Sequence, residues 1–392
     1  MHLLETLLAA LAALSACYWG VAAWVALRTR RGSSAVTSAR PPVSLLVPVA
    51  GAEGGLRENL RAALAALGPD DELLVGAALP RDPALDVARA ALGHDPRAAV
   101  VPGAVGEGTN RKVLALEALE RRARHDVLVQ IDSDVRLDRA ALDALVLPLV
   151  DTPATRLSTA LYRIEHAGGP GARLEAATVH GEFALNVVVA RALAGELRFA
   201  LGAANALRRE ALAGLGGYRA LAEHLADDHE LGRRVAAHGG RVALAPCVVP
   251  IVHTSRLGET VARLRRWART YRACSPWGYL GTAFTHHGVA AALALAVVSR
   301  TPWALGVLLG VLAVRITAAA AGHALVEARF GVREALAIPV RDLLGTALFA
   351  LAWTGSTVHW RGREFVVERD GRLRPVAPLH ATHIAREAGA EP

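Results

Sequence analysis

Short apolar runs alternate with amphipathic stretches over residues 42–255, and this alternation is the main pattern in the chain. Apolar runs of strand length predict strands at 43–49, 73–78, 98–101, 127–131, 157–161, 199–207 and 241–245. Apolar residues at helical spacing predict helices at 56–67, 86–92, 112–124, 174–193 and 219–238. Strands that alternate with helices indicate an α/β domain with a parallel sheet, whose ligands bind beyond the carboxyl ends of the strands.

The N-terminal apolar segment predicts a membrane anchor. Residues 6–27 carry no charge, and a membrane span needs about 20 apolar residues. Arg28, Arg30 and Arg31 follow at once, and by the positive-inside rule they place that end of the segment in the cytoplasm. A cleaved signal peptide is the alternative, but it has positive charge before its apolar run, where this chain has Glu5. The pattern therefore favours an anchor that is not cleaved.

A second apolar zone begins near residue 281. Residues 283–299 and 302–325 predict a helical hairpin joined by Arg300 and Thr301. Residues 338–353 are a third candidate span, although they include two charged residues, and ionisable residues at membrane depth are costly unless they are paired. These charged residues are Arg341 and Asp342. Buried helices of a soluble domain remain the alternative for these alanine-rich segments, and most of all for the last one.

Composition supports a chain that combines a soluble domain with membrane segments. Of the 392 residues, 53% are hydrophobic and 20% are charged, with a mean hydropathy of +0.30. The chain is therefore more apolar than an ordinary soluble enzyme and more charged than a protein made only of membrane helices. The expected parts are an anchor at 1–31, a linker at 32–41, an α/β domain at 42–255, an amphipathic interfacial segment at 256–281, transmembrane helices at 282–357 and a polar tail at 358–392.

The net charge of +8 indicates a partner that carries negative charge. Basic residues gather directly before the predicted hairpin, which favours an anionic phospholipid surface over nucleic acid. They are Arg256, Arg263, Arg265, Arg266, Arg269 and Arg272. The three cysteines, Cys17, Cys247 and Cys274, are scattered and show neither a disulfide framework nor the spacing of a metal site.

A pair of carboxylates follows the predicted strand at 127–131. Asp132 and Asp134 are one residue apart, so both can contact one Mg²⁺ or Mn²⁺ ion while a bound diphosphate supplies further oxygens. Such a metal neutralises the leaving group of a transfer reaction. The alternative is an ordinary turn or a helix cap.

A second acidic motif, Asp227-Asp228-His229-Glu230, lies in the helical stretch 219–238. Adjacent carboxylates repel each other, so the two aspartates are not both fully ionised when they are buried. One of them could then act as a general base toward an acceptor hydroxyl. The alternative is a solvated helix surface, because charged residues continue along the same stretch.

Arg263, Arg266 and Trp267 share one helix face because they are spaced i, i+3 and i+4. Arginine forks fit phosphate oxygens, and tryptophan can stack on a sugar or lie at a membrane interface. The alternative is a membrane-surface helix whose arginines contact lipid headgroups, and both roles can hold together. Two acidic motifs, this basic cluster and an adjacent membrane indicate transfer of a sugar from a nucleotide donor to a lipid acceptor.

The ordered set of motifs resembles membrane-bound family 2 glycosyltransferases of the ceramide glucosyltransferase type, and most closely their bacterial relatives in hopanoid biosynthesis. The resemblance spans about residues 3–376. The motifs that carry it are VSLLVPV at 43–49, DPALDV at 82–87, NRK at 110–112, DSDVR at 132–136, GGY at 216–218, ADDHELG at 226–232, RLRRWART at 263–270 and WRGR at 360–363.

The resemblance implies a GT-A fold, which is a Rossmann-like α/β domain for nucleotide sugars, with transmembrane segments at both ends. It implies an inverting single displacement that depends on Mg²⁺ or Mn²⁺. Metal and diphosphate would bind at Asp132 and Asp134, Asp82 would contribute to the donor site, and Asp228 would be the catalytic base.

The resemblance also implies a role for the basic cluster and a location. Arg263, Arg266 and Trp267 would close over donor and acceptor. The donor would be of the UDP-glucose or UDP-N-acetylglucosamine type, and the acceptor a hopanoid or a ceramide in the inner (cytoplasmic) membrane. The early donor motif departs from the family pattern, because residues 47–51 read VPVAG and residues 77–82 keep one aspartate.

Two alternatives to catalysis on a lipid remain open. A degenerate, non-catalytic membrane protein that binds a nucleotide sugar is favoured by the altered early motif and disfavoured by the retained acidic and R-x-x-R-W residues. A polysaccharide synthase is a weaker alternative, because such chains have more membrane spans with which to form a channel.

Overall fold

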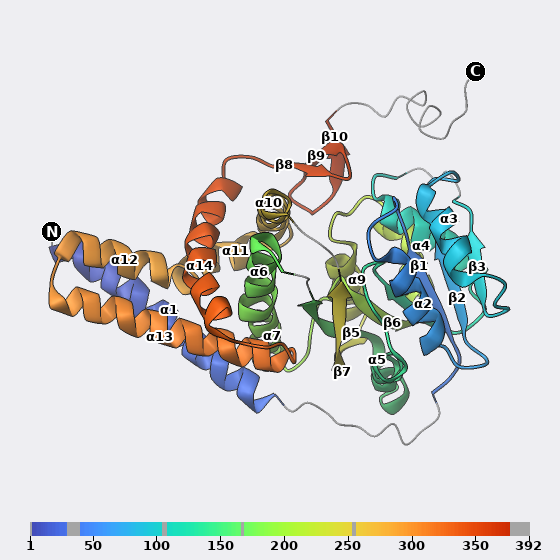
Figure 1. Ribbon diagram of the computed structural model, residues 1–392, viewed down its shortest axis with the longest axis horizontal. Coiled ribbons are helices and arrows are strands. Elements are labelled where there is room, and N and C mark those ends of the chain that lie inside the picture. The colour runs from blue at the N-terminus through green and yellow to red at the C-terminus, as the bar shows by residue number, and fades with distance from the viewer. Residues whose placement is uncertain (1, 30–39, 104–107, 166–167, 253–255, 377–392) are drawn as a thin grey trace. The chain divides into compact units, whose positions relative to one another are not determined.

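The computed structural model describes residues 2–29, 40–103, 108–165, 168–252 and 256–376 (Figure 1). The chain divides into two compact units. The helical unit comprises Met1–Arg30, His166–Gly195 and Thr254–Val358, and the α/β unit comprises Arg31–Glu165, Glu196–His253 and His359–Pro392. Arg30, Arg31, the expected linker up to residue 39 and the tail beyond residue 376 lie outside the described residues.

A seven-stranded sheet forms the core of the α/β unit, with the order β3-β2-β1-β4-β6-β5-β7. The strands β1 to β4 are parallel neighbours, and β5 is parallel to β7, but β6 is antiparallel to both β4 and β5. The sheet is therefore mixed, whereas the sequence pattern predicted a parallel one. The strands are β1 Val43–Pro48, β2 Glu72–Gly76, β3 Ala98–Val101, β4 Val127–Ile131, β5 Thr155–Glu165, β6 Ala204–Arg208 and β7 Arg241–Val252.

Every residue of β1, β2 and β4 is buried. Because successive side chains of a strand point to opposite faces, both faces of the sheet are covered at these strands, as parallel strands require. The helices of this unit are α2 Leu56–Ala66, α3 Pro83–Leu92, α4 Arg111–Arg122, α5 Arg139–Asp151, α8 Arg209–Gly214, the 3₁₀ turn η2 Tyr218–Leu221 and α9 Asp227–Ala237.

Long-range hydrogen bonds interrupt the long helix predicted at 219–238. The backbone N–H of Asn110 donates to Ala222 O at 2.8 Å, and that of Leu225 donates to Gly371 O at 3.2 Å. The segment between η2 and α9 is thereby tied to distant parts of the unit, and α9 begins only at Asp227. A second, three-stranded sheet of β8 Thr357–Trp360, β9 Arg363–Val367 and β10 Leu373–Pro375 forms where the sequence suggested a polar tail.

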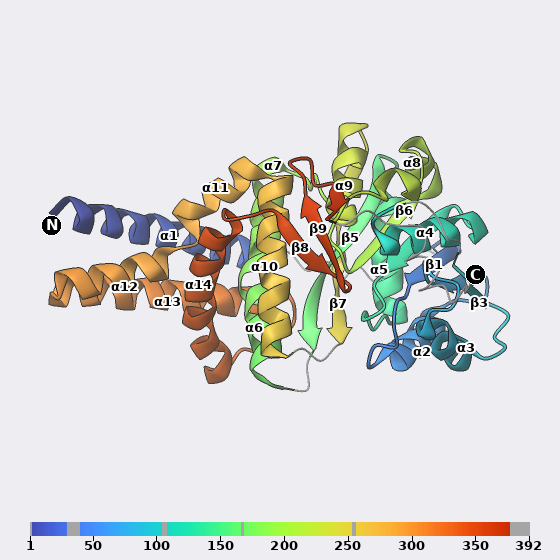
Figure 2. The same ribbon diagram turned by 90° about the horizontal axis from the view of Figure 1, so that it is seen from above.

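The helical unit contains three helices that are long and apolar enough to cross a membrane, among the described residues: α1 His2–Arg28, α13 Pro302–Leu325 and α14 Val332–Ala352. A fourth candidate is the pair α11 Pro276–Thr285 and α12 Gly288–Ser299, which is bent by 42° at its break. Helices α1, α12 and α13 lie side by side (Figures 1 and 2) and share a core around Ala12, Ala292 and Val311.

The remaining helices of this unit are α6 Pro170–Thr178, the π-helical turn η1 Val179–Phe183, α7 Ala184–Ala194 and α10 Leu257–Cys274. The elements α6, η1 and α7 follow one another without a break, so the predicted helix at 174–193 contains a π turn. A Cβ atom on Gly322 of α13 would lie 2.2 Å from His180 O, so only glycine allows α13 to pass this close to η1.

Candidate active site

The first acidic motif lies at the carboxyl end of β4, beside β1. The chain order of the sheet reverses at this pair of strands, which is where α/β sheets bind ligands. Backbone contacts hold the loop. Asp132 N donates to Ala203 O at 3.0 Å, Val252 N donates to Asp134 O at 2.8 Å, and the Asn59 side chain donates to Ser133 O at 3.1 Å. Both carboxylates therefore stand on a rigid part of the unit.

The second acidic motif occupies the first turn of α9, where the peptide dipoles favour negative charge. Asp227 is 6% exposed, and Asp228 is partly exposed. Asn110, which is fully buried at the start of α4, connects this turn to α4. Its side-chain NH₂ donates to His224 O at 2.8 Å and to Asp227 Oδ1 at 3.3 Å. The two aspartates are thus held in place and are not simply part of a solvated helix surface.

Lys112 brings the two acidic motifs together. Its Nζ lies 2.7 Å from Asp132 Oδ1 and 3.6 Å from Asp227 Oδ2. The sequence motifs gave this residue no chemical role, but a signal is present in the composition. Of the 44 basic residues one is lysine, so the other 43 (44 − 1) are arginine. In a chain that uses arginine everywhere else, the one lysine lies between the acidic motifs.

Burial and charge perturb the pKa values of these groups. The pKa of Asp132 is raised above its ordinary value, mainly by burial. The charge of Lys112 lowers this pKa, and the charge of Asp134 raises it further. Since 35% of the Asp132 side chain is exposed, solvent screens part of this shift. Burial alone would lower the pKa of Lys112, but the neighbouring carboxylates raise it, so the ammonium stays charged. Burial, and then the charge of Asp227, raises the pKa of Asp228 to about 6.

Gly202 leaves the space that the Asp228 carboxylate occupies. A Cβ atom at this position would lie 3.1 Å from Asp228 Oδ2, which is tighter than an ordinary van der Waals contact. Gly232 has a similar role one turn further along α9, because a Cβ there would lie 2.2 Å from Ala200 N. These two glycines let α9 pack closely against the segment before β6.

Asp82 has a local structural role in this unit. It caps the N-terminus of α3, where its Oδ1 accepts hydrogen bonds from Ala84 N at 2.9 Å and from Gly51 N at 2.8 Å. Gly51 lies in the loop after β1 and has a φ of 71°, a conformation that favours glycine. Asp82 therefore shapes the loop at the carboxyl end of the strand next to β4.

The three residues of the R-x-x-R-W cluster lie on α10, in the helical unit. Arg263 forms an ion pair with Glu175 of α6, whose side chain is buried. Trp267 packs against a small core of leucines from three helices of the unit, namely Leu174, Leu264 and Leu348. Arg266 lies one turn from Arg263 on the same helix. His253, which directly follows β7, lies outside the described residues.

The acidic residues are suited to a divalent metal that is completed by its substrate. No group of three or more histidine, cysteine or carboxylate side chains that could hold a metal occurs among the described residues. Carboxylate oxygens are the ligands that Mg²⁺ and Mn²⁺ prefer, and Mg²⁺ is commonly bound through one or two carboxylates and substrate phosphates. Asp132 is also the carboxylate that contacts the Lys112 ammonium, so a metal bound there would share Asp132 with this cation.

Comparison with known proteins identifies the family. The family model for glycosyl transferase family 21 matches residues 7–373. The chain belongs to glycosyl transferase family 21. It is therefore a glycosyltransferase, as the motifs indicated, and the family is numbered 21 where the resemblance suggested 2.

The fold of this family 21 enzyme resembles that of solved glycosyltransferases. A mannosyltransferase from Pyrobaculum calidifontis, solved with GDP-mannose and Mn²⁺, is 20% identical, covers 88% of this chain and 98% of its own, and has a TM-score of 0.51. This likeness confirms the GT-A type of α/β fold. A glucosyl-3-phosphoglycerate synthase from Mycobacterium tuberculosis is also 20% identical, covers 62% of this chain and 83% of its own, and has a TM-score of 0.41.

Proposed function

We propose that this family 21 enzyme transfers a sugar, with inversion, from a nucleotide-sugar donor of the UDP-glucose or UDP-N-acetylglucosamine type to a hopanoid lipid in the membrane. One observation carries the proposal. Lys112 holds the two acidic motifs together at the ligand-binding edge of a GT-A sheet, in a chain that also has apolar helices of membrane-spanning length. The first feature fits a soluble charged donor, and the second fits a lipid acceptor.

Asp132 and Asp134 are the proposed ligands of Mg²⁺ or Mn²⁺, together with the diphosphate of the donor. The metal supplies neutralisation of the charge that develops on the leaving diphosphate. A metal bound there would share Asp132 with the Lys112 ammonium, which would also be available to phosphate oxygens of the donor. Asp82 supports the donor side by fixing the backbone at Gly51. The similar mannosyltransferase, which holds GDP-mannose with Mn²⁺, supports this assignment.

Asp228 is the proposed general base. The acceptor hydroxyl oxygen forms a bond to the anomeric carbon of the sugar while the bond from that carbon to the diphosphate oxygen breaks. The hydroxyl proton passes to the Asp228 carboxylate as the new bond forms. A pKa raised to about 6 makes this carboxylate a better proton acceptor than an ordinary aspartate while it stays largely ionised near neutral pH.

Arg263, Arg266 and Trp267 are the proposed contacts of α10 with the donor and the acceptor. Arg263 already pairs with Glu175, but a guanidinium carries five N–H donors and can bind a phosphate oxygen as well. The arginines elsewhere on α10 would face anionic phospholipids, and nucleic acid is not a proposed partner.

The proposed location is the inner (cytoplasmic) membrane, with the α/β unit in the cytoplasm. This follows from Arg28 at the end of α1, since the positive-inside rule places that end in the cytoplasm. The proposed division keeps an anchor at 1–31, a catalytic domain at 42–255, an interfacial segment at 256–281 and membrane helices at 282–357. Within the catalytic range, residues 166–195 belong structurally to the helical unit.

The test uses the full chain purified in detergent, with a panel of nucleotide sugars and with hopanoid and ceramide acceptors. The expected product is a glycosylated hopanoid whose anomeric configuration is opposite to that of the donor. Transfer to ceramide alone would replace the acceptor in this proposal by a sphingolipid. Binding of a donor without transfer to any lipid would support the non-catalytic alternative.

A further inference from the structure

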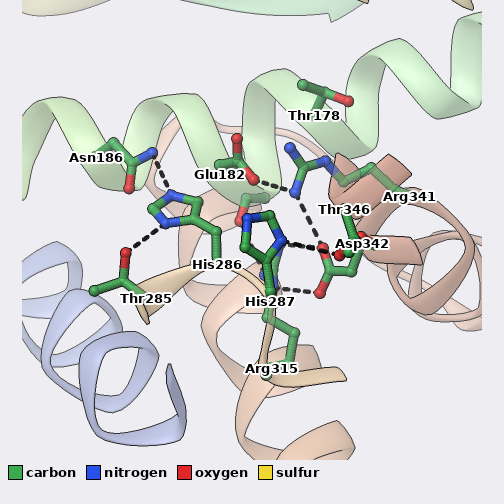
Figure 3. A network of polar contacts seen from close by, with 12 residues as sticks. Thr178, Glu182, Asn186, Thr285, His286, His287, Arg315, Arg341, Asp342 and Thr346 are labelled. Carbon is green, nitrogen blue, oxygen red and sulfur yellow. Dashed lines mark hydrogen bonds and ion pairs between the residues drawn. The ribbon is translucent and has the colours of Figure 1, made fainter. Parts of the chain in front are cut away.

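The helical unit contains a cluster of polar side chains in an otherwise apolar setting (Figure 3). It forms where η1 and α7 meet α13, α14 and the break between α11 and α12. Ionisable residues at membrane depth are costly and usually functional. We call this group the polar cluster; its members are Glu182, Asn186, His286, His287, Arg315, Arg341, Asp342 and Thr346.

The centre of the polar cluster is a closed ionic network. Arg315 Nε lies 2.8 Å from Asp342 Oδ2, and the side chains of both residues are 2% exposed. Arg341 pairs with Glu182 and lies 3.1 Å from Asp342 Oδ1. Two acidic and two basic side chains therefore balance in charge, which explains how Arg341 and Asp342 are tolerated within a candidate span.

The π turn η1 contributes to this network through its backbone. A π turn changes the regular helical hydrogen-bonding pattern, and here Gly181 O accepts a hydrogen bond of 3.0 Å from Arg315 Nη1. The Arg315 guanidinium also lies 4.0 Å from the ring centroid of Trp19 on α1. The centre of the cluster thus holds α1, η1, α13 and α14 together and has a structural role.

The edge of the polar cluster is organised differently. The Tyr18 hydroxyl donates to Asn186 Oδ1 at 2.6 Å, and the Asn186 NH₂ donates to His286 Nε2 at 3.0 Å. Because this nitrogen accepts, the neutral His286 ring carries its proton on Nδ1, which donates to Thr285 Oγ1 at 2.7 Å. Both nitrogens of His286 are therefore engaged.

His287 differs from its neighbour in one nitrogen. The Thr346 hydroxyl donates its one hydrogen to Asp342 O at 3.0 Å. In the contact of 2.9 Å between Thr346 Oγ1 and His287 Nδ1, the hydroxyl oxygen must therefore accept and Nδ1 must donate. In the neutral ring, Nε2 then carries the lone pair and is an acceptor. This atom is buried and has no hydrogen-bond partner within the part of the chain that the structure describes. A buried acceptor of this kind is matched by a group that donates a hydrogen bond.

His287 lies between a polar pair and a group of aromatic rings. Figure 3 shows the rings of His286 and His287 beside the Glu182–Arg341 pair, and the Glu182 side chain is 18% exposed, in contrast to the closed Asp342. On another side, His287 lies 4.7 Å from the ring of Phe349, which stacks on Tyr279 at 5.0 Å. An apolar molecule with a hydroxyl group suits this combination of surfaces.

We propose that the edge of the polar cluster binds the hydroxyl-bearing head of the acceptor lipid, with the lipid O–H donating to His287 Nε2. Glu182 offers a second acceptor to a further hydroxyl, and Phe349 and Tyr279 contact the apolar body. This inference rests on the proposed transfer to a lipid and identifies where the helical unit recognises the acceptor class. Hopanoids with a hydroxylated side chain and ceramides share this chemistry.

His323 provides a matched control within the same unit. It is 1% exposed, its Nδ1 contacts Ala319 O at 2.8 Å, and its Nε2 is likewise buried without a hydrogen-bond partner among the described residues. Its ring is enclosed, however, by edge contacts with His180 at 4.8 Å and Phe330 at 4.9 Å. A substitution here perturbs a buried histidine without touching the proposed lipid site.

The test measures lipid binding to the full chain in detergent by the rise in its unfolding temperature with lipid concentration. The probes are a polyhydroxylated hopanoid, ceramide and a hopanoid hydrocarbon without hydroxyl groups. His287→Phe keeps an aromatic ring beside Phe349 and removes both nitrogens. We expect it to weaken binding of a hydroxylated lipid about tenfold, as loss of one buried hydrogen bond predicts, and to leave hydrocarbon binding unchanged.

Two further variants make the result specific. His287→Gln restores a hydrogen-bonding group and should recover part of the affinity for the hydroxylated lipid, whereas His323→Gln should bind all three probes as the wild type does. Equal weakening toward the hydrocarbon, or an equal effect of His323→Gln, would overturn the proposal by showing a general packing role. Unchanged binding in His287→Phe would overturn it as well.

Enzyme kinetics separate this site from the proposed function. In His287→Phe, the KM for the lipid should rise about tenfold, while donor KM and the slow hydrolysis of the donor without lipid stay at wild-type values. If hydroxylated lipids bind through His287 but none receives a sugar, the proposed function fails and the site stands. If sugar is transferred with an unchanged lipid KM in this variant, the site fails and the function stands. The lipid that binds the wild-type protein more tightly, the hydroxylated hopanoid or ceramide, is the acceptor class that this site favours.

Discussion

The general base should reveal itself in the pH dependence of transfer. Burial and the charge of Asp227 raise the pKa of Asp228 from 3.8 to about 6. The profile of kcat/KM reports groups of the free enzyme, and a base acts only when it is ionised. At pH 5, roughly one tenth of such carboxylates are ionised, so kcat/KM should fall about tenfold from its plateau. An aspartate of ordinary pKa would stay roughly nine-tenths ionised at that pH.

Substitutions in the acidic pair test this assignment. Asp228→Asn keeps the shape and removes the base, and should lower kcat by about 10²–10⁴ while donor binding, measured by calorimetry, is retained. Asp227→Asn removes a negative charge that raises the pKa of Asp228, so its acid limb should move to lower pH with a smaller loss of kcat. A flat profile down to pH 5 at saturating metal would refute the reasoning. A larger loss in Asp227→Asn would make that residue the base.

Three other substitutions and one labelling experiment test the site and its location. Asp134→Ala should abolish the Mn²⁺-dependent part of donor binding and nearly all turnover; full wild-type activity in EDTA would contradict the metal. Lys112→Met removes the cation that would compete with the proposed metal for Asp132, so Mn²⁺ affinity without donor, measured by electron paramagnetic resonance, should rise by about tenfold or more; an unchanged affinity would reject this competition. Gly202→Ala should lower kcat and spare donor binding, whereas Gly214→Ala, where a Cβ meets nothing within 4 Å, should be neutral. A cysteine at Ala52 should resist thiol reagents applied outside intact cells.

The sequence pattern predicted strands best where burial is complete. The ranges at 43–49 and 127–131 agree closely with the fully buried β1 and β4, because uninterrupted apolar runs between turn residues have few other solutions. The range at 98–101 also matches β3, although that strand is only partly buried. The antiparallel direction of β6 could not be predicted, since an apolar run does not show whether a strand is parallel or antiparallel to its neighbours. The broken helix at 219–238 was missed because distant carbonyls, such as Gly371 O, decide where α9 begins.

The candidate membrane helices could be predicted from the apolar composition of their segments, but the ion pairs between these helices could not. Arg341 and Asp342 counted against a span when taken alone. Their partners, Glu182 and Arg315, lie in separate elements that only the tertiary fold brings together, and Glu182 reaches Arg341 from a π turn that no periodicity signals. The two charged residues that counted against α14 as a span are thus paired with opposite charges from other elements of the helical unit.

The acidic motifs could be found from local sequence because each is a short run at the end or start of an element. The NRK motif at 110–112 contains Lys112, but its contacts could not be predicted from local sequence, since its two partners belong to β4 and α9, which are distant in the chain. The available signal was compositional. A chain that otherwise uses arginine keeps one lysine, and a count of residue types is enough to distinguish position 112 from every other basic position.

Lysine at this position suits the proposed metal-dependent transfer better than arginine would. A guanidinium binds carboxylates through a planar fork of several N–H donors and would stay fixed between two acidic groups. An ammonium is a compact point charge on a flexible stem, so it neutralises Asp132 without a metal and, in the proposed mechanism, would turn to another anion once a metal is bound. A single lysine would suit the proposed exchange with a metal, which connects the chain's most unusual compositional feature to the chemistry proposed for its acidic edge.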